Sequence, residues 1–173
     1  MTDPRFPIGA FVRPLLLEPD ERCAAIEQIR ATPSRIRTAL GGLDERQLDT
    51  PYRPGGWTLR QVAHHLPDSH LNAYIRCKLA LTEDAPTIKP YDEAAWARLQ
   101  DSRLPIAVSL TLLDSVHERW VVLLESLSEA EWERTFVHPE VGVTRLDQLV
   151  ALYSWHGRHH EAHVTSLRDR MGW

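Results

Sequence analysis

The chain has 173 residues, of which 43% are hydrophobic and 25% are charged, and it carries a formal net charge of −4 at pH 7. This length favours one core, so we expect residues 1–173 to form a single domain, and the mixed composition excludes disordered and fibrous proteins. Its Lys and Arg residues are scattered rather than gathered into a basic stripe, which argues against a nucleic-acid partner.

Residues 1–18 are expected to form an extended arm that lies over the body of the protein. Prolines recur in and next to this segment, and each fixes its own φ and removes a backbone donor. The start also lacks the apolar run and the small-residue cleavage site of a signal peptide. No apolar run in the sequence approaches the ~20 residues that cross a bilayer. We therefore expect a cytoplasmic protein that makes no membrane contact.

Helical periodicity predicts two long helices in the first half of the chain. Apolar residues recur at helical spacing over 20–40, where Pro33 is expected to break or kink the helix. A turn-rich stretch follows, and a capping box that begins at Thr58 then predicts a helix over 58–81. Pro67 lies inside this second helix and is expected to bend it.

The second half of the chain predicts two more long helices, at 105–127 and 144–170, each with an apolar stripe. A brief strand pair is expected within 136–143, which contains turn residues. The stretch 82–104 is long enough to be a crossover or a functional lid, and it contains a short helix around 92–100. Four long helices with one long crossover are best accommodated as an all-α four-helix bundle.

Four of the nine histidines lie close together in the last predicted helix. Residues four apart on a helix can aim two imidazoles at one ion, so His156 with His160 and His159 with His163 are both candidate pairs. The apolar stripe of this helix places His160 near its centre and His156 within it, whereas His159 lies well to the side. We expect His156 and His160 to point into the bundle, where a metal ion would satisfy them. Hydrogen bonds to backbone or carboxylate groups are the alternative.

A third ligand is expected on the helix over 58–81, which carries a second group of histidines. Its buried stripe is flanked by His65 and His70 on opposite sides, and the periodicity does not choose between them. His64 points away from this stripe and is expected in solvent, and His117 is expected at the surface. Asp68, three residues after His65, is a candidate proton acceptor or orienting partner, with an ordinary surface carboxylate as the alternative.

Several motifs keep the order and spacing of a known family. They are the arm residues Phe6-Pro7-Ile8-Gly9, the run from Gly56-Trp57-Thr58 to His64-His65, the segments Ala80 to Asp84 and Lys89-Pro90-Tyr91, and Trp155-His156-Gly157-Arg158-His159-His160. Together they resemble the YfiT branch of the DinB-like superfamily, from about residue 6 to residue 168. The resemblance implies a cytosolic four-helix bundle, often dimeric, with one zinc or nickel ion held by three histidines. The matching positions are His65, His156 and His160, and Pro67 departs from the helix former that is usual there.

The resemblance also implies an enzyme, either a metal-dependent hydrolase or, as in similar relatives, an S-transferase for a low-molecular-weight thiol such as bacillithiol. Three imidazoles leave a divalent ion at least one position for water or substrate, as in catalytic sites. Such an ion can lower the pKa of water toward ~7 or bind a thiol as its thiolate. Asp68, His159 and Glu161 are candidate catalytic groups that would handle protons or orient the substrate, a small molecule. A non-catalytic module in which the metal merely stabilises the fold is the third interpretation.

Overall fold

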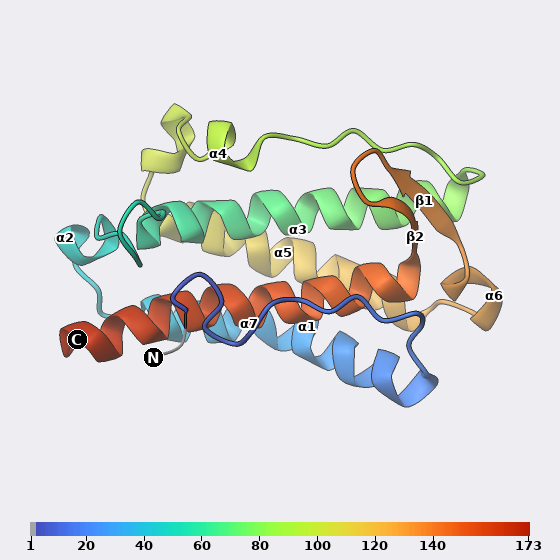
Figure 1. The fold of residues 1–173 in the computed structure, drawn as a ribbon, viewed down its shortest axis with the longest axis horizontal. Coiled ribbons are helices and arrows are strands. Elements are labelled where there is room, and N and C mark those ends of the chain that lie inside the picture. The colour runs from blue at the N-terminus through green and yellow to red at the C-terminus, as the bar shows by residue number, and fades with distance from the viewer. Residues whose placement is uncertain (1–2) are drawn as a thin grey trace.

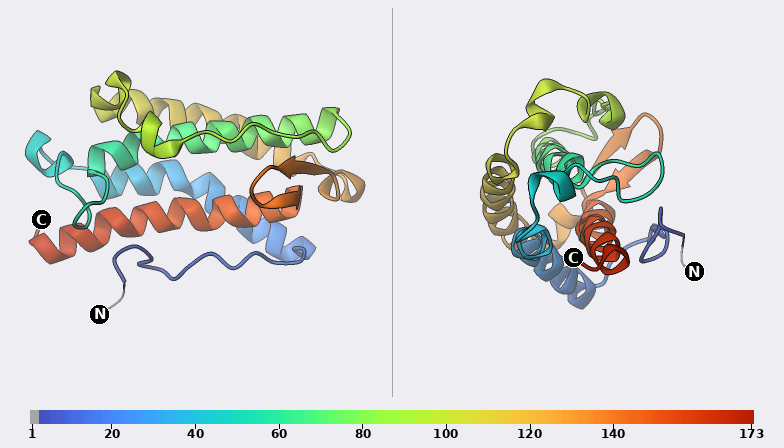
Figure 2. Two further views of the ribbon diagram at one scale, coloured as in Figure 1. Left: turned by 45° about the horizontal axis from the view of Figure 1, so that its top comes forward. Right: turned by 90° about the vertical axis from the view of Figure 1, so that its left-hand side faces the viewer.

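The computed structural model describes residues 3–173, in which four long helices pack side by side (Figure 1). These helices are α1 (Pro19–Leu40), α3 (Leu59–Thr82), α5 (Ile106–Glu125) and α7 (Leu146–Met171). Helices α1 and α3 each pack on both α5 and α7, and the end view in Figure 2 shows the four helices arranged in a ring. The predicted all-α four-helix bundle is confirmed.

The helix boundaries follow the capping signals of the sequence. Before α3, the Thr58 hydroxyl accepts from the Gln61 backbone N–H at 3.1 Å, and the Gln61 side chain accepts from the Thr58 N–H at 3.0 Å. This capping box satisfies two backbone donors that the first turn leaves without a helical partner. At the other end of the chain, Gly172 closes α7 with a φ of 68°, a left-handed conformation that glycine adopts without strain.

The two internal prolines do not end their helices. Pro33 lies inside α1 and Pro67 inside α3, and both side chains are buried. Of the expected break or kink at Pro33, the break is wrong, because the helix tolerates the loss of one hydrogen bond when other groups satisfy the freed carbonyl. At Pro33 the carbonyl in question belongs to Ile29, four residues earlier, and it accepts from the ring of His117 at 2.7 Å.

The long crossover between α3 and α5 runs along α3, as Figure 1 shows. It contains α4 (Glu93–Trp96) and the short 3-10 helix η1 (Gln100–Arg103), so the predicted connection and its short helical segment are confirmed. The Gln61 side chain of α3 donates to the Ala97 carbonyl at 2.9 Å and holds the crossover against the bundle. A further one-turn helix, α2 (Glu45–Leu48), was not expected in the turn-rich stretch.

A small hairpin closes one end of the bundle. After α6 (Glu129–Trp132), strands β1 (Thr135–His138) and β2 (Gly142–Arg145) pair antiparallel, with Phe136 opposite Thr144, which confirms the expected strand pair. Of the expected arm, residues 1–2 lie outside the described part, residues 3–9 form two turns, and residues 10–18 are extended and lie along α7. Arg13 fixes it there, because its guanidinium donates to the Val143 carbonyl at 2.5 Å and to the Gln148 side chain at 2.6 Å.

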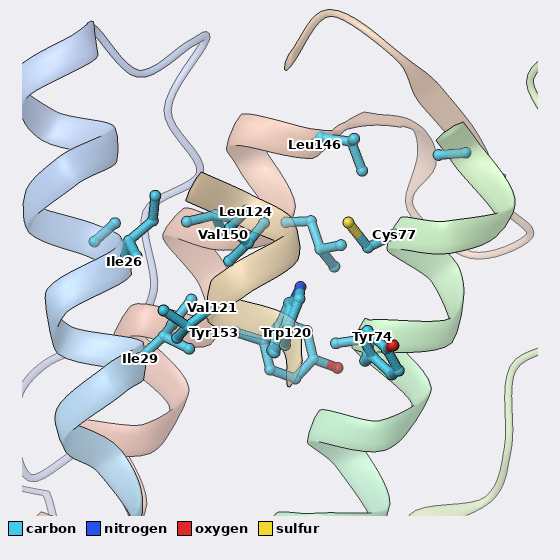
Figure 3. Close-up of a cluster of buried hydrophobic side chains, with 14 of the residues drawn as sticks. Ile26, Ile29, Tyr74, Cys77, Trp120, Val121, Leu124, Leu146, Val150 and Tyr153 are labelled. Atoms are coloured by element: carbon cyan, nitrogen blue, oxygen red, sulfur yellow. The ribbon is translucent and has the colours of Figure 1, made fainter. Parts of the chain in front are cut away.

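The apolar core consists of two clusters that follow each other along the bundle. Figure 3 shows the first, in which Ile29, Trp120 and Tyr153 meet from three helices. Along α7 this cluster ends at Tyr153, and the second cluster contributes Val164 and Leu167. The four histidines of α7 fill the interval between the two clusters. Among residues 3–173, no helix combines the length and the apolar character that spanning a membrane requires.

Candidate metal centre

The structure brings together three histidines from two helices. One ring nitrogen each of His65 on α3 and of His156 and His160 on α7 lies within 4.8 Å of the other two. The Nε2 atoms of His65 and His156 are 3.3 Å apart. His65 and His160 are buried, whereas His156 is partly exposed. These are the three positions that the family resemblance implied as metal ligands.

The spacing of these nitrogens suits a metal ion. Zinc–imidazole bonds of 2.0–2.1 Å in a tetrahedral site place two ligand nitrogens roughly 3.3–3.4 Å apart. The Nε2 atoms of His65 and His156 already have this separation, and the third nitrogen is close enough to reach the same ion after a small ring movement. Imidazole nitrogen is a good ligand for both zinc and nickel. Three imidazoles therefore suit either ion and do not distinguish between them.

Burial keeps the three rings in the form that binds metal. It lowers the pKa of His65 to about 4, because the imidazolium ion loses the solvation that water would provide. Burial likewise lowers the pKa values of His156 and His160 well below the usual 6.5, and the neighbouring histidines add to this effect. All three imidazoles are therefore neutral at pH 7 and each has a lone pair available for a cation.

The structure shows which of the two α3 candidates, His65 and His70, joins the three-histidine group; helical periodicity did not choose between them. His70 has no exposed surface, and its Nε2 lies 3.1 Å from Nδ1 of His156, on the far side of that ring from His65. His70 is thus a neighbour of the three-histidine group and not a member. The indole of Trp57, which precedes the first turn of α3, packs against the His65 ring with centroids 4.6 Å apart.

Two expectations about histidines outside the group are wrong. His64 was expected in solvent but is buried, with its ring nitrogens 2.7 Å from the Ser109 hydroxyl and 3.0 Å from the Leu104 carbonyl. His117 was expected at the surface but is only 2% exposed. The apolar stripe of a helix marks only one buried face. It does not show whether neighbouring elements also cover the other faces. Here α5 and the crossover cover His64, and α1 and α3 cover His117.

The three candidate catalytic residues occupy different environments. Asp68 is partly buried, and desolvation raises the pKa of its carboxyl group to about 6. His159 is buried and stacks on Trp155 with centroids 4.2 Å apart, outside the three-histidine group. Glu161 follows Gly157 by one helical turn and therefore lies on the α1 side of α7. Of the three, Asp68 has the protonation behaviour that a proton acceptor near neutral pH needs.

A cavity of about 450 Å³ lies beside Tyr153 and Ser69, and sequence reasoning did not find it. None of the three grouped histidines lines it, and Tyr153 stands between the cavity and His156. Its wall includes Tyr153, whose ring packs against His156 with centroids 5.5 Å apart, and Ser69, whose hydroxyl donates to the Tyr153 hydroxyl at 3.3 Å. The crossover contributes Tyr91, and α3 contributes the guanidinium of Arg76. These residues come from distant parts of the chain, so no local sequence pattern reports the cavity.

The fold and this site define a four-helix bundle protein with a three-histidine group suited to holding a metal ion. The family model of the DinB superfamily matches residues 28–164, and the chain belongs to this superfamily. Proteins of Bacillus mycoides (strain KBAB4) and Bacillus cereus (strain B4264), both named "putative metal-dependent hydrolase", are 55% and 56% identical, with each chain covered completely.

Two solved structures share the fold. YfiT from Bacillus subtilis, described as a probable metal-dependent hydrolase with an unusual four-helix bundle topology, superposes with a TM-score of 0.96 at 43% identity and with 99% of each chain covered. The four-helix bundle protein TT2238 superposes with a TM-score of 0.57 at 19% identity, covering 84% of this chain and 98% of its own, and shares the fold alone. The resemblance to the YfiT branch of the DinB superfamily is therefore confirmed.

Proposed function

We propose that the protein is a divalent-metal-dependent hydrolase whose ligands are His65, His156 and His160. The observation that carries this proposal is the convergence of three neutral imidazoles from α3 and α7. Within residues 3–173, no cysteine, carboxylate or further histidine joins this group. A divalent ion held by three protein ligands keeps at least one position for exchangeable ligands, which distinguishes catalytic from structural sites. The names of the relatives agree with this class of activity.

Different residues can supply the functions that a metal-dependent hydrolase needs, such as excluding water and accepting a proton. When bound, zinc or nickel would supply Lewis-acid activation of water or of a carbonyl oxygen. Trp57 covers His65 and limits the access of bulk water to that side. Asp68 can accept a proton near neutral pH, because burial raises its pKa to about 6. His159 and Glu161 are weaker candidates, because burial lowers the pKa of His159 to about 4 and Glu161 lies on the α1 side of α7.

The cavity beside Tyr153, one ring away from His156, is the place we propose for a small, polar substrate. Its volume of about 450 Å³ is in the range of small-molecule sites. Arg76 offers a positive charge, Tyr91 a hydroxyl group, and Asp92 and Glu93 negative charges. The Tyr91 hydroxyl is buried and has no partner among the described residues, so a substrate atom could satisfy it. A molecule with both acidic and basic groups matches this lining best.

The test is a hydrolysis assay with protein loaded with zinc or nickel. We expect turnover of an ester or amide in a small-molecule panel, its loss on treatment with a chelator and its return when the metal is added back. His160→Ala should abolish turnover, and Asp68→Asn should lower it while the bound metal is retained. A loaded protein that hydrolyses nothing in such a panel contradicts the proposal.

Transfer of a low-molecular-weight thiol is the alternative function. The same open position could hold a thiol as its thiolate. The chain has no thiol of its own at the site, because Cys77 is buried in the apolar core and Cys23 is not part of the histidine group. The thiol would therefore enter as a substrate. Conjugation of bacillithiol or another thiol to monochlorobimane, with release of chloride and a proton, would favour this function over hydrolysis.

A non-catalytic role makes a different prediction. If the metal only joined α3 to α7, the metal-free protein would unfold at a much lower temperature, yet the loaded protein would show neither hydrolysis nor thiol conjugation. The two assays above, run beside a thermal unfolding measurement, separate the three functions.

A further inference from the structure

Each of the two α7 histidines in the group contacts another histidine through Nδ1. Nδ1 of His156 lies 3.1 Å from Nε2 of His70, and Nδ1 of His160 lies 3.3 Å from Nδ1 of His163. His70 and His163 are almost completely buried, at 0% and 3% exposure. Both outer rings therefore need hydrogen bonds, and the direction of those bonds determines which nitrogen of each inner ring carries its proton.

Both series of contacts end on a backbone carbonyl. The first continues from Nδ1 of His70 to Nε2 of His117 at 2.8 Å, and Nδ1 of His117 lies 2.7 Å from the Ile29 carbonyl. The second ends where Nε2 of His163 lies 3.3 Å from the Arg5 carbonyl. A carbonyl oxygen only accepts hydrogen bonds, so the ring nitrogen that faces it must carry a hydrogen.

The carbonyls thereby fix the direction of every bond in the two series. Neutral His117 donates from Nδ1 to Ile29, so its Nε2 accepts from Nδ1 of His70. Nε2 of His70 is then an acceptor, and Nδ1 of His156 donates to it. The second series behaves in the same way: His163 donates from Nε2, its Nδ1 accepts, and Nδ1 of His160 donates. In both inner rings the Nε2 lone pair is left free.

The chain supplies these two acceptors in unusual ways. The Ile29 carbonyl lies four residues before Pro33, which has no N–H to occupy it within α1. The Arg5 carbonyl belongs to the N-terminal arm, which lies along α7. An internal proline and the N-terminal arm thus provide the ends of the hydrogen-bond series.

We propose that His70, His117 and His163 are positioning residues that hold His156 and His160 in the Nδ1–H tautomer, with Nε2 presented to the metal ion. This inference rests on the proposed metal site. Its physical basis is general, because a ligand histidine is oriented by the hydrogen bond that its other ring nitrogen makes. Here the partners are neutral imidazoles that are themselves anchored to the backbone, so the orientation exists before any ion binds.

The first test is a long-range proton–nitrogen correlation NMR spectrum of the unmodified, metal-free protein. We expect the Nδ1–H tautomer for His70, His117, His156 and His160, and the opposite Nε2–H tautomer for His163, which serves as an internal control. A free imidazole in water favours Nε2–H, so the expected pattern is not the default. An Nε2–H tautomer at His156 or His160 overturns the proposal.

The second test measures zinc affinity by competition with a chromophoric chelator. His70→Leu removes the acceptor for His156 and should weaken zinc binding roughly 10–100-fold, the usual effect of losing such a partner. His70→Gln, whose side-chain oxygen can take the place of Nε2, should recover most of this loss. His64→Leu is the matched control, because His64 lies on the same helix, is also buried, at 6% exposure, and also makes two hydrogen bonds.

The outcomes separate this inference from the proposed function. If His70→Leu weakens zinc binding no more than His64→Leu does, His70 acts only through fold stability and the inference is wrong. If His70→Leu does not fold, the NMR tautomers of the unmodified protein alone test the positioning role. If the expected tautomers are found but the protein hydrolyses nothing, the positioning role is supported. That result would contradict only the proposed hydrolase activity.

Discussion

Gly157 of α7 faces Thr32 of α1 so closely that a Cβ atom on Gly157 would lie 2.5 Å from the Thr32 hydroxyl oxygen. Thr32 cannot easily withdraw, because it is 2% exposed and its hydroxyl donates to the Gln28 carbonyl at 2.9 Å. The missing side chain at Gly157 therefore sets how closely α1 approaches α7, directly beside His156. The close approach also lets α1 bring the Ile29 carbonyl to His117 in the bundle interior.

We predict that Gly157→Ala destabilises the fold. Alanine would favour the helix by about 1 kcal/mol. Overpacking a tight contact typically costs about 1–3 kcal/mol, and the 2.5 Å separation places this case toward the upper end. A net loss of about 1–2 kcal/mol should appear in urea unfolding. In a Thr32→Ala background the same replacement should cost much less, and an equal cost in both backgrounds would show that the contact is not responsible.

The proposed metal ligands can be tested with substitutions at two adjacent histidines. His159 and His160 are both 7% exposed, but only His160 belongs to the three-histidine group. We expect His160→Ala to lose about one equivalent of zinc or nickel in elemental analysis, whereas His159→Ala keeps it. Retention of the full equivalent by His160→Ala would refute the ligand assignment. Loss from both variants would indicate a general effect on folding, which circular dichroism would detect.

The stability of the metal-free protein should fall steeply in mild acid. Desolvation lowers the pKa of every one of the nine histidines, for example to about 4 at His65 and His117. Between pH 6.5 and 4 the unfolded chain therefore binds more protons than the folded chain, so stability is fully present above pH 6.5 and is lost as the pH falls. Each unit of pKa difference is worth ~1.4 kcal/mol per group.

Thermal unfolding of the metal-free protein at a series of pH values between 8 and 4.5 measures this effect. The midpoint should be nearly constant at the upper end and then decline below pH 6.5. His64→Asn should make the midpoint fall less steeply below pH 6.5, since desolvation lowers the pKa of His64 as well. A midpoint that does not change until the carboxylates titrate would contradict the interpretation.

The sequence predicts the four helices well because their signals are local. The capping box at Thr58 and the apolar stripes need no knowledge of other segments. Periodicity also selected His156 with His160, since both follow the stripe of one helix. It failed at His64 and His117 for the same reason: their burial depends on other elements that pack against them, and a single helical stripe carries no such information.

Local sequence patterns also could not predict the hydrogen bonds that join the three-histidine group to His70, His117 and His163. The contact between His117 and His70 joins residues 47 positions apart, and the contact between His163 and Arg5 joins residues 158 positions apart. The sequence predicts that Pro33 breaks or kinks the helix, whereas in the structure the helix continues and Pro33 leaves a carbonyl free for His117. The effect of Pro33 depends on the packing of α1 against α5, which brings the free carbonyl to His117.

The last prediction concerns Asp68, whose pKa is raised from 3.8 to about 6, first by desolvation and then by the charge of Asp101. An acid with a raised pKa in the folded state opposes folding once it ionises, because the unfolded chain gives up its proton at lower pH. Asp68→Asn should therefore leave the unfolding midpoint unchanged near pH 4, raise it progressively between pH 4 and 6, and keep it higher at pH 8.

A stabilised Asp68→Asn variant that turns substrate over more slowly would also explain why the chain keeps a costly carboxylate three residues after His65. Natural sites often sacrifice stability for a group that the reaction needs. Asn72→Ala is a suitable control, since Asn72 lies on the next turn of α3 and donates only to the backbone carbonyl of Asp68. If Asp68→Asn gains no stability at pH 8, the carboxylate is better solvated than its surroundings imply, and its role as proton acceptor loses its physical basis.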